Sequence, residues 1–202
     1  MEVGVLAIQG DFAEHIAVLG KLGVKAREVR LPEHLDSLDG LIIPGGESTT
    51  LSRLMTIYSL REPVTKMAEL GHAVWGTCAG MIMLSREITE NDPVPLGVID
   101  IGVQRNAFGR QVDSFEQSLN VCGLGPDPFH AIFIRAPLII RVGEDVKVLS
   151  TLDGERPVAV QQGNLMATSF HPELTNDYRF HRHFLDLAVG KNKSSKARKG
   201  AP

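Results

Sequence analysis

The 202-residue chain has the composition of a soluble globular protein, with 43% hydrophobic and 22% charged residues and a formal net charge of -3. That charge argues against a dedicated nucleic-acid surface, and no apolar run approaches the ~20 residues that cross a bilayer. The first residues, MEVGVLAIQG, carry an acid where a signal peptide carries basic residues. Two cysteines, Cys78 and Cys122, do not suggest a disulfide framework. We therefore expect a cytoplasmic protein.

The first 90 residues alternate buried-strand patterns with helical patterns. Strands are expected in VGVLAIQG, VKAREV, GLIIPGG and HAVWGT, which are short apolar runs. Helices are expected over residues 11–23, over residues 48–70 with a break at 61–63, and over residues 79–86. In the first of these, Asp11 is expected to cap the helix, with Glu14 and His15 on its exposed face.

From about residue 98 the sequence pattern changes to short runs of β-forming residues separated by Gly and Pro. These runs are LNVCGL, AIFIRAP, VKVLSTLD, PVAVQQG and LMATSFHPE, and a helix is expected in DYRFHRHFLDLAVG. We predict a three-layer α/β/α fold with a mostly parallel central sheet and an antiparallel, β-rich extension in the C-terminal half. Residues 1–190 are expected to form one domain, and the basic segment 191–202 a disordered tail.

Three strand ends carry the candidate chemistry, because ligands of open α/β sheets bind at the carboxyl ends of the strands. The stretches are IIPGGEST, VWGTCAGM and TSFHPEL. They supply a glycine pair, Cys78, and His171 followed two residues later by Glu173. A thiol nucleophile, an imidazole that moves its proton and a carboxylate that orients the imidazole form a catalytic triad.

Each of these features has an ordinary structural explanation when it is taken alone. Cys78 can be a small core residue, His171 a strand-end residue, and PGGEST a turn with a helix cap or a phosphate loop. The last is disfavoured because the Walker lysine is absent. The order of the three stretches favours thiol catalysis. Cys78 would then stand on a nucleophile elbow, and the backbone amides of Gly46 and Ala79 would form the oxyanion hole.

The sequence resembles the class I, triad-type glutamine amidotransferases, and within them the glutaminase subunits of pyridoxal 5'-phosphate synthases. The resemblance runs from Val3 to about Leu187. Its markers are AIQGDFAEH, PGGESTTLSRL, GTCAGMI, RNAFGRQVDSFE, FIRAP and SFHPEL. Many other branches carry Gln where this chain has Ile82. The basic tail lies outside the resemblance.

This resemblance implies hydrolysis of L-glutamine by Cys78, His171 and Glu173, with ammonia passing to a separate synthase subunit that makes pyridoxal 5'-phosphate. It also implies a glutamine-binding set: Gly46, Glu47, Ser48, Arg105, Ile134 and Arg135. An arginine suits a free α-carboxylate because guanidinium binds it through two parallel hydrogen bonds. No cofactor or metal is expected, since no Cys/His cluster has zinc-like spacing.

Two other functions stay open at this point. The chain could serve a different amidotransferase or be a related cysteine hydrolase, or it could be a non-enzymatic binding module that keeps the fold. The presence of Cys78, His171 and Glu173 together disfavours the binding module.

Overall fold

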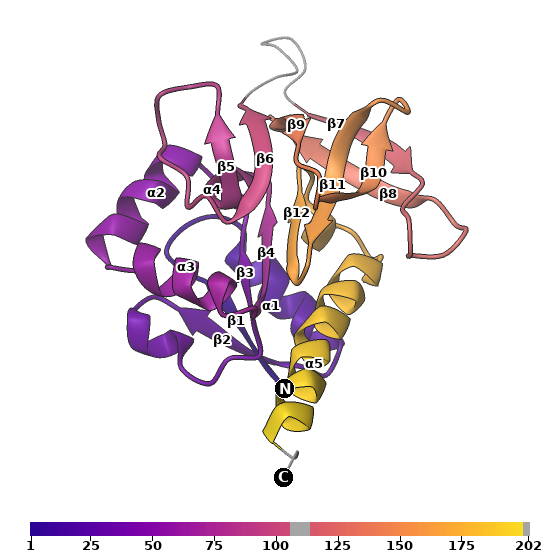
Figure 1. Cartoon of the computed structure of the whole chain (residues 1–202). Helices are drawn as coiled ribbons and strands as arrows, with labels where there is room; N and C mark the ends of the chain where they lie inside the picture. The colour runs from indigo at the N-terminus through magenta and orange to yellow at the C-terminus, as the bar shows by residue number, and fades with distance from the viewer. Residues whose placement is uncertain (106–113, 200–202) are drawn as a thin grey trace.

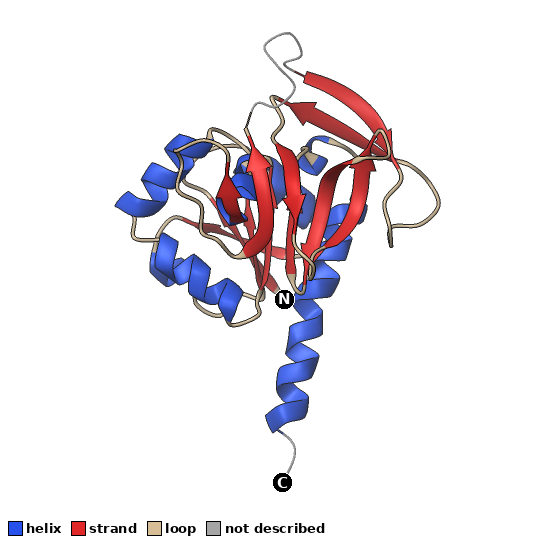
Figure 2. Cartoon of the chain, turned by 45° about the horizontal axis from the view of Figure 1, so that its top comes forward, coloured by secondary structure: helices blue, strands red, loops and turns tan. Residues whose placement is uncertain are grey.

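A seven-stranded sheet forms the middle of three layers, with helices on both of its faces (Figure 1; Figure 2). This computed structural model describes residues 1–105 and 114–199, with side chains described up to residue 190. The strand order is β10-β11-β12-β4-β3-β1-β2. Five of these strands run parallel: β1 (Glu2–Leu6), β2 (Lys25–Val29), β3 (Gly40–Ile43), β4 (Ala73–Thr77) and β12 (Leu165–Thr168). The remaining two continue antiparallel: β10 (Lys147–Leu152) and β11 (Arg156–Gln162).

The parallel strands are buried on both faces, which is why their sequences are nearly continuous apolar runs. Successive residues of one strand enter different cores: Trp75 belongs to one hydrophobic cluster and Val74 to the other. The helices α2 (Ser48–Ile57), α3 (Arg61–Glu69) and α4 (Ala79–Leu84) contribute to the cluster of Val74. The helices α1 (Phe12–Lys21) and α5 (Arg179–Lys199) contribute to the cluster of Trp75.

Two smaller sheets complete the C-terminal half. One contains β5 (Ser85–Ile88), β6 (Ile99–Gln104) and β9 (Leu138–Val142), and the other pairs β7 (Ser114–Leu119) with β8 (Phe129–Ile134). Figure 1 shows this second pair on the opposite side of the molecule from α2. Two 3-10 turns, η1 (Pro32–Leu35) and η2 (Pro172–Leu174), lie at strand ends.

The predicted three-layer α/β/α fold is confirmed, with four local differences. The helix break expected at residues 61–63 lies at residues 58–60, because Pro63 is tolerated in the first turn of α3. The strand expected in LNVCGL does not form. The preceding strand β7 ends at Leu119, the first residue of that stretch, and the chain then turns at Gly123, whose φ is +86°. The helix expected over 79–86 ends at Leu84 and gives way to β5. The strand before SFHPE joins the two parts of the sheet: β12 pairs antiparallel with β11 on one side and parallel with β4 on the other, and so brings the C-terminal half into the main sheet.

The C-terminal helix α5 continues through Lys199, past residue 190. The backbone of residues 191–199 is therefore helical where the sequence suggested disorder, in keeping with the helix propensity of its lysine, arginine and alanine residues. The boundary expected at residue 190 does not coincide with a helix end, and the division into 1–190 and 191–202 stays a prediction. Residues 106–113 of the RNAFGRQVDSFE marker and residues 200–202 lie outside the described part of the chain.

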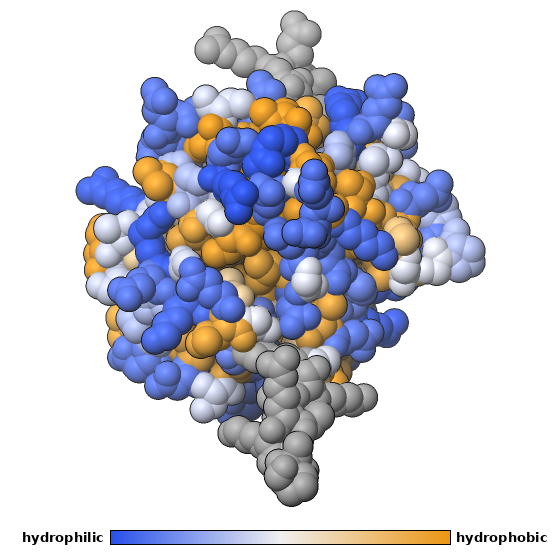
Figure 3. Space-filling view, viewed as in Figure 1, coloured by the Kyte–Doolittle hydropathy of each residue, from blue (hydrophilic) through white to orange (hydrophobic). Residues whose placement is uncertain are grey.

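Hydrophobic and hydrophilic residues are interspersed over the face shown in Figure 3. The most exposed large hydrophobic residues, Val94, Leu70 and Ile57, come from different segments of the chain. No helix in the described part of the chain has the length and apolar character needed to cross a membrane.

Candidate active site

Cys78 stands on a strained turn between β4 and α4. Its backbone has φ +48° and ψ -103°, a conformation that is costly for a residue with a side chain and is found mainly where surrounding structure enforces it. The Cys78 N–H donates to the Thr168 carbonyl at 2.8 Å, which ties the turn to the end of β12. The side chain is 7% exposed. This is the geometry of a nucleophile elbow.

The glycines on either side of Cys78 are required by close backbone approach. A Cβ on Gly80 would lie 2.0 Å from the carbonyl oxygen of Ile43, and a Cβ on Gly76 would lie 2.4 Å from the carbonyl of Gly80. Both distances are shorter than real Cβ contacts, and the neighbouring atoms belong to the backbone. The pattern Gly-Thr-Cys-Ala-Gly therefore follows from how tightly the elbow packs on β3.

His171 and Glu173 approach Cys78 from the adjacent strand. Because β12 pairs parallel with β4, the two strands end at the same edge of the sheet. The His171 N–H donates to the Ile132 carbonyl at 2.9 Å, and its Nδ1 lies 2.7 Å from Glu173 Oε1. The Cys78 side chain lies close enough to the ring to raise the pKa of His171. His171 and Glu173 are buried, and the nucleophile, imidazole and carboxylate lie together at this edge of the sheet.

The electrostatic setting favours a charged imidazole. Burial lowers the pKa of His171, but contacts with Asp11, Cys78 and Glu173 outweigh that effect and raise the pKa to about 12. Burial raises the pKa of the Glu173 carboxyl, and its hydrogen bond with His171 acts against that shift. An imidazolium beside a thiol is the pairing that stabilises a thiolate nucleophile.

A pocket of about 290 Å³ opens over these residues. Its walls are Asp11, Gly46, Glu47, Ser48, Cys78, Ala79, Ile82, Arg105, Ile134, Arg135, Pro137 and His171. Every residue of the expected glutamine-binding set lines this pocket, as do both expected oxyanion donors. The volume is near the lower end of the ~300–1,000 Å³ range of small-molecule sites, which suits a single amino acid.

The polar wall of the pocket is built around Glu47. Its carboxylate caps α2 by accepting from the Thr50 N–H at 2.7 Å, accepts from the Thr49 hydroxyl, and pairs with Arg105 Nη2 at 3.3 Å. Partial burial raises the pKa of Glu47, but the hydrogen bonds from Thr49 and Thr50 dominate and lower it to about 2. Arg105 also donates to the Asp92 carbonyl at 2.6 Å. A charge pair, rather than a lone arginine, therefore faces the pocket.

The other expected binding residues come from the end of β8. Arg135 has a φ of +43°, and the Ile134 carbonyl lies 3.9 Å from Cys78 Sγ. Gly46, which also lines the pocket, has a φ of +142°, and the Glu47 N–H donates to Gln9 Oε1 at 3.0 Å. Backbone at unusual dihedral angles thus lines the pocket at Gly46 and Arg135 as well as at the nucleophile.

Two residues that the sequence assigned to a cap and an exposed face lie at the site. Asp11 does not bond the helix with its side chain; Oδ2 lies 3.4 Å from His171 Nδ1. Its hydrogen bond with His171 lowers the pKa of Asp11, although burial acts the other way. His15 is 0% exposed, so its placement on a solvent face was wrong. The sequence did carry a signal for burial, because His15 lies three residues after Phe12 and four before Leu19, on the same face of the helix as these apolar residues.

Asp11, His171 and Glu173 are also the described residues that could hold a metal ion, with ligand atoms within 4.8 Å of one another. A proton fits this position better. The 2.7 Å contact between His171 Nδ1 and Glu173 Oε1 is a hydrogen bond, which places a proton between these two atoms. We therefore assign the cluster to hydrogen bonding.

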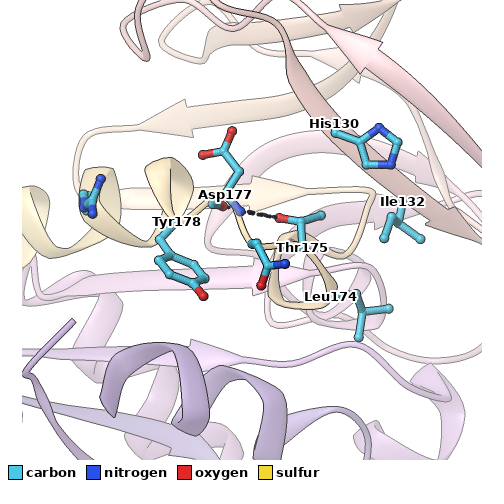
Figure 4. A pocket seen from close by; sticks show the side chains of 8 residues that line it. His130, Ile132, Leu174, Thr175, Asp177 and Tyr178 are labelled. Carbon is cyan, nitrogen blue, oxygen red and sulfur yellow. Dashed lines mark hydrogen bonds between the residues drawn. The ribbon is translucent and has the colours of Figure 1, made fainter. Parts of the chain in front are cut away.

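A second, shallow pocket of about 760 Å³ lies behind η2 and does not include the triad. Figure 4 shows its lining side chains, with Leu174 and Ile132 at one end and Tyr178 at the other. The Asp177 N–H donates to Thr175 Oγ1 at 3.2 Å. None of its lining residues is Cys78, His171 or a member of the expected glutamine-binding set, which separates it from the candidate active site.

Residues 5–190 match the SNO glutamine amidotransferase family. The chain belongs to this family. Similar proteins named pyridoxal 5'-phosphate synthase subunit PdxT occur in Herpetosiphon aurantiacus and Thermus thermophilus. The first is 56% identical over 190 residues, covering 93% of this chain and 100% of that protein, and the second is 56% identical over 188 residues, covering 92% and 97%.

Solved structures agree with the family assignment. A crystal structure titled glutamine amidotransferase has a TM-score of 0.88 and 54% identity, and covers 93% of this chain and 98% of its own. A putative GMP synthase component from Thermoplasma acidophilum has a TM-score of 0.70 at 18% identity, covering 97% and 98%, and shows that the fold is shared.

Proposed function

We propose that this amidotransferase is a glutaminase that hydrolyses L-glutamine to L-glutamate and ammonia and delivers the ammonia to a pyridoxal 5'-phosphate synthase partner. One observation carries the glutaminase assignment: Cys78 lies on a strained elbow and lines the same pocket as His171, which Glu173 holds at 2.7 Å. The 290 Å³ pocket above these residues has room for one amino acid. The relatives named PdxT support the choice of partner.

The proposed reaction begins with the Cys78 thiolate attacking the side-chain carboxamide carbon of glutamine. The carbonyl oxygen takes up negative charge, which the backbone N–H groups of Gly46 and Ala79 stabilise. His171 then gives its proton to the departing nitrogen, the C–N bond breaks, and ammonia leaves a glutamyl thioester. His171, now neutral, removes a proton from water as the water attacks the thioester. Glutamate is released and the thiolate with its imidazolium is restored.

The pocket wall supports roles for the charged residues in binding. The glutamine α-carboxylate suits Arg105 or Arg135, and the α-ammonium suits Glu47, whose low pKa keeps it ionised. Arg105 and Glu47 form an ion pair with each other at 3.3 Å. Bound glutamine would replace this one pair with two, its carboxylate pairing with the arginine and its ammonium with Glu47. Gly46, Ser48 and Ile134 would define the remaining shape.

The partner is proposed to dock over the rim of the pocket, on the stretch QGDFAEH and the loop 47–50, where Glu47 and Thr50 are exposed. We also propose that residues 1–190 suffice for the glutaminase reaction and that the protein works in the cytoplasm. The second candidate, a component of a different amidotransferase, keeps the same hydrolysis and changes only the acceptor of ammonia.

The test is ammonia release from saturating glutamine by the purified chain, with and without a PdxT-type synthase partner. We expect hydrolysis that rises when the synthase is added, and glutamine-dependent pyridoxal 5'-phosphate formation by the mixture. Hydrolysis with no pyridoxal 5'-phosphate would favour the second candidate. Absence of hydrolysis in the complex would refute the glutaminase assignment.

A further inference from the structure

A buried pair of histidines lies behind the triad and has no part in the reaction steps above. His15 on α1 and His181 on α5 are both 0% exposed, and His15 Nδ1 lies 3.0 Å from His181 Nε2. The edge of each ring meets the indole of Trp75 on β4, at centroid distances of 5.6 and 4.9 Å. Buried imidazoles are costly unless their nitrogens are paired, so the arrangement needs an explanation.

The second nitrogen of His15 faces both halves of the active site. His15 Nε2 lies 3.3 Å from the Thr77 hydroxyl and 3.4 Å from Glu173 Oε2. Thr77 directly precedes the nucleophile, and Glu173 bonds the catalytic imidazole through its other oxygen. Within the described residues, Glu173 Oε2 is buried and makes no standard hydrogen bond, so His15 is a donor placed at the long end of hydrogen-bond range.

The tautomer of His15 follows from its neighbours. Burial, together with His181 and His171, holds the pKa of His15 well below its usual value, so the ring is neutral and carries one N–H. A proton on Nε2 serves Glu173 and Thr77, and leaves Nδ1 to accept from His181 Nε2. The other tautomer would turn a lone pair toward the Glu173 carboxylate. It would also leave an N–H on His181 Nδ1, which makes no hydrogen bond among the described residues.

We propose that His15 is a positioning residue for the catalytic base. Its Nε2–H holds Glu173 against the end of β4, and His181 fixes the tautomer that makes this possible. A carboxylate held at both oxygens keeps one rotamer, and therefore keeps the His171 ring aimed at Cys78. The proposal rests on the glutaminase function for its kinetic consequences, but its structural consequence can be measured without glutamine.

The kinetic test compares three variants in the complex with the synthase partner. His15→Leu removes the donor and keeps an apolar side chain of similar size, whereas His15→Gln can keep an N–H near Glu173. His183→Leu is the matched control, because His183 lies on α5 with His181 but bonds Gln161 at 2.8 Å, away from the site. Loss of a partner that orients a catalytic histidine typically costs roughly 10–100-fold where it has been measured, in metal sites. We expect kcat to fall about tenfold in His15→Leu with KM nearly unchanged, and to be largely restored in His15→Gln.

The second readout is the low-field proton resonance of the His171 Nδ1–H, which reports its hydrogen bond to Glu173. We expect it to shift or to disappear through exchange in His15→Leu and to persist in His15→Gln and His183→Leu. An unchanged resonance in a folded His15→Leu variant would overturn the proposal, as would a kcat equal to that of the wild type. If the wild type releases no ammonia, the glutaminase assignment fails while the resonance still tests this inference. If His15→Leu does not fold, His181→Leu, which frees the tautomer, gives the same readout.

Discussion

The two sides of the active site are held by different kinds of interaction. The elbow of Cys78 is fixed by backbone contacts: its N–H bonds Thr168, and Gly80 packs against the Ile43 carbonyl. The base is fixed by side chains from separate elements, with Asp11 and Glu173 on His171 and His15 behind Glu173. A backbone-fixed site depends on glycines at certain positions and tolerates change of the functional side chain. A site held by side chains is disturbed by substitutions at residues that do not touch the substrate themselves.

The largest effect on activity is expected at the nucleophile, where a substitution should remove catalysis without lowering the stability of the fold. Cys78→Ala should abolish glutamine hydrolysis and leave the unfolding transition nearly unchanged, because backbone contacts hold the elbow. Ammonia release and thermal unfolding of the purified variant measure the two quantities. Cys122→Ala is the control, since that cysteine is exposed and should be dispensable. Measurable turnover by Cys78→Ala would exclude a nucleophilic role.

On the base side, the loss should be graded. His171→Ala removes the group that carries the proton, whereas Glu173→Gln removes only the charge that orients and stabilises it. We expect turnover to fall further in His171→Ala than in Glu173→Gln, in part because Asp11 leaves a second carboxylate 3.4 Å from His171 Nδ1. Steady-state kinetics of both variants and of the Asp11→Asn/Glu173→Gln double variant test this ranking. Equal loss in the two single variants would contradict it.

Gly80→Ala should break the elbow without touching a functional side chain. The added methyl would lie 2.0 Å from the Ile43 carbonyl oxygen, so β3 and α4 must move apart. Overpacking of this kind costs about 1–3 kcal/mol, and the displaced Cys78 should lose most of its activity. Chemical denaturation gives the change in stability. Gly20→Ala, on an open helix surface where the Cβ meets no atom within 4 Å, is the matched control and should be neutral or stabilising.

Mild acid is expected to have a smaller effect, a decrease in the free energy of unfolding that arises from the buried histidine pair. Burial lowers the pKa of His181 to about 3, below its value of 6.5 in the unfolded chain. The unfolded state therefore binds more protons than the folded state between pH 6.5 and 3. The stability that comes from a neutral His181 is complete above pH 6.5 and is lost as the pH falls toward 3. Between pH 7 and 5 this amounts to at most about 2 kcal/mol for one histidine. The free energy of unfolding should fall less over that range in His181→Leu than in the wild type; equal slopes would contradict a buried, neutral His181.

Local patterns were sufficient for the elements that end at the sheet edge. The run HAVWGT followed by Cys-Ala-Gly indicates a strand, a tight turn and a helix, and β4, the elbow and α4 follow in that order. SFHPEL likewise indicates a strand end, and the one-residue gap between His171 and Glu173 brings the two side chains together, because η2 starts between them. LNVCGL was misjudged because its apolar residues serve a turn beside β10 rather than a strand.

Taken by itself, the sequence determined the layers and the strand ends that carry Cys78, His171 and Glu173, because these depend on hydrophobic period, turn residues and spacing within a few residues. The glutamine-binding residues of the pocket came from the resemblance to a known family. Only the tertiary structure decided that Asp11 turns from its helix to His171, and that His15 meets His181 from a helix 166 residues away. A capping residue has several acceptable partners, and a histidine at an i+3 spacing is compatible with either core or solvent. The choice is made by the packing of α1 and α5 on the same face of β4, where burial leaves each polar atom with few partners.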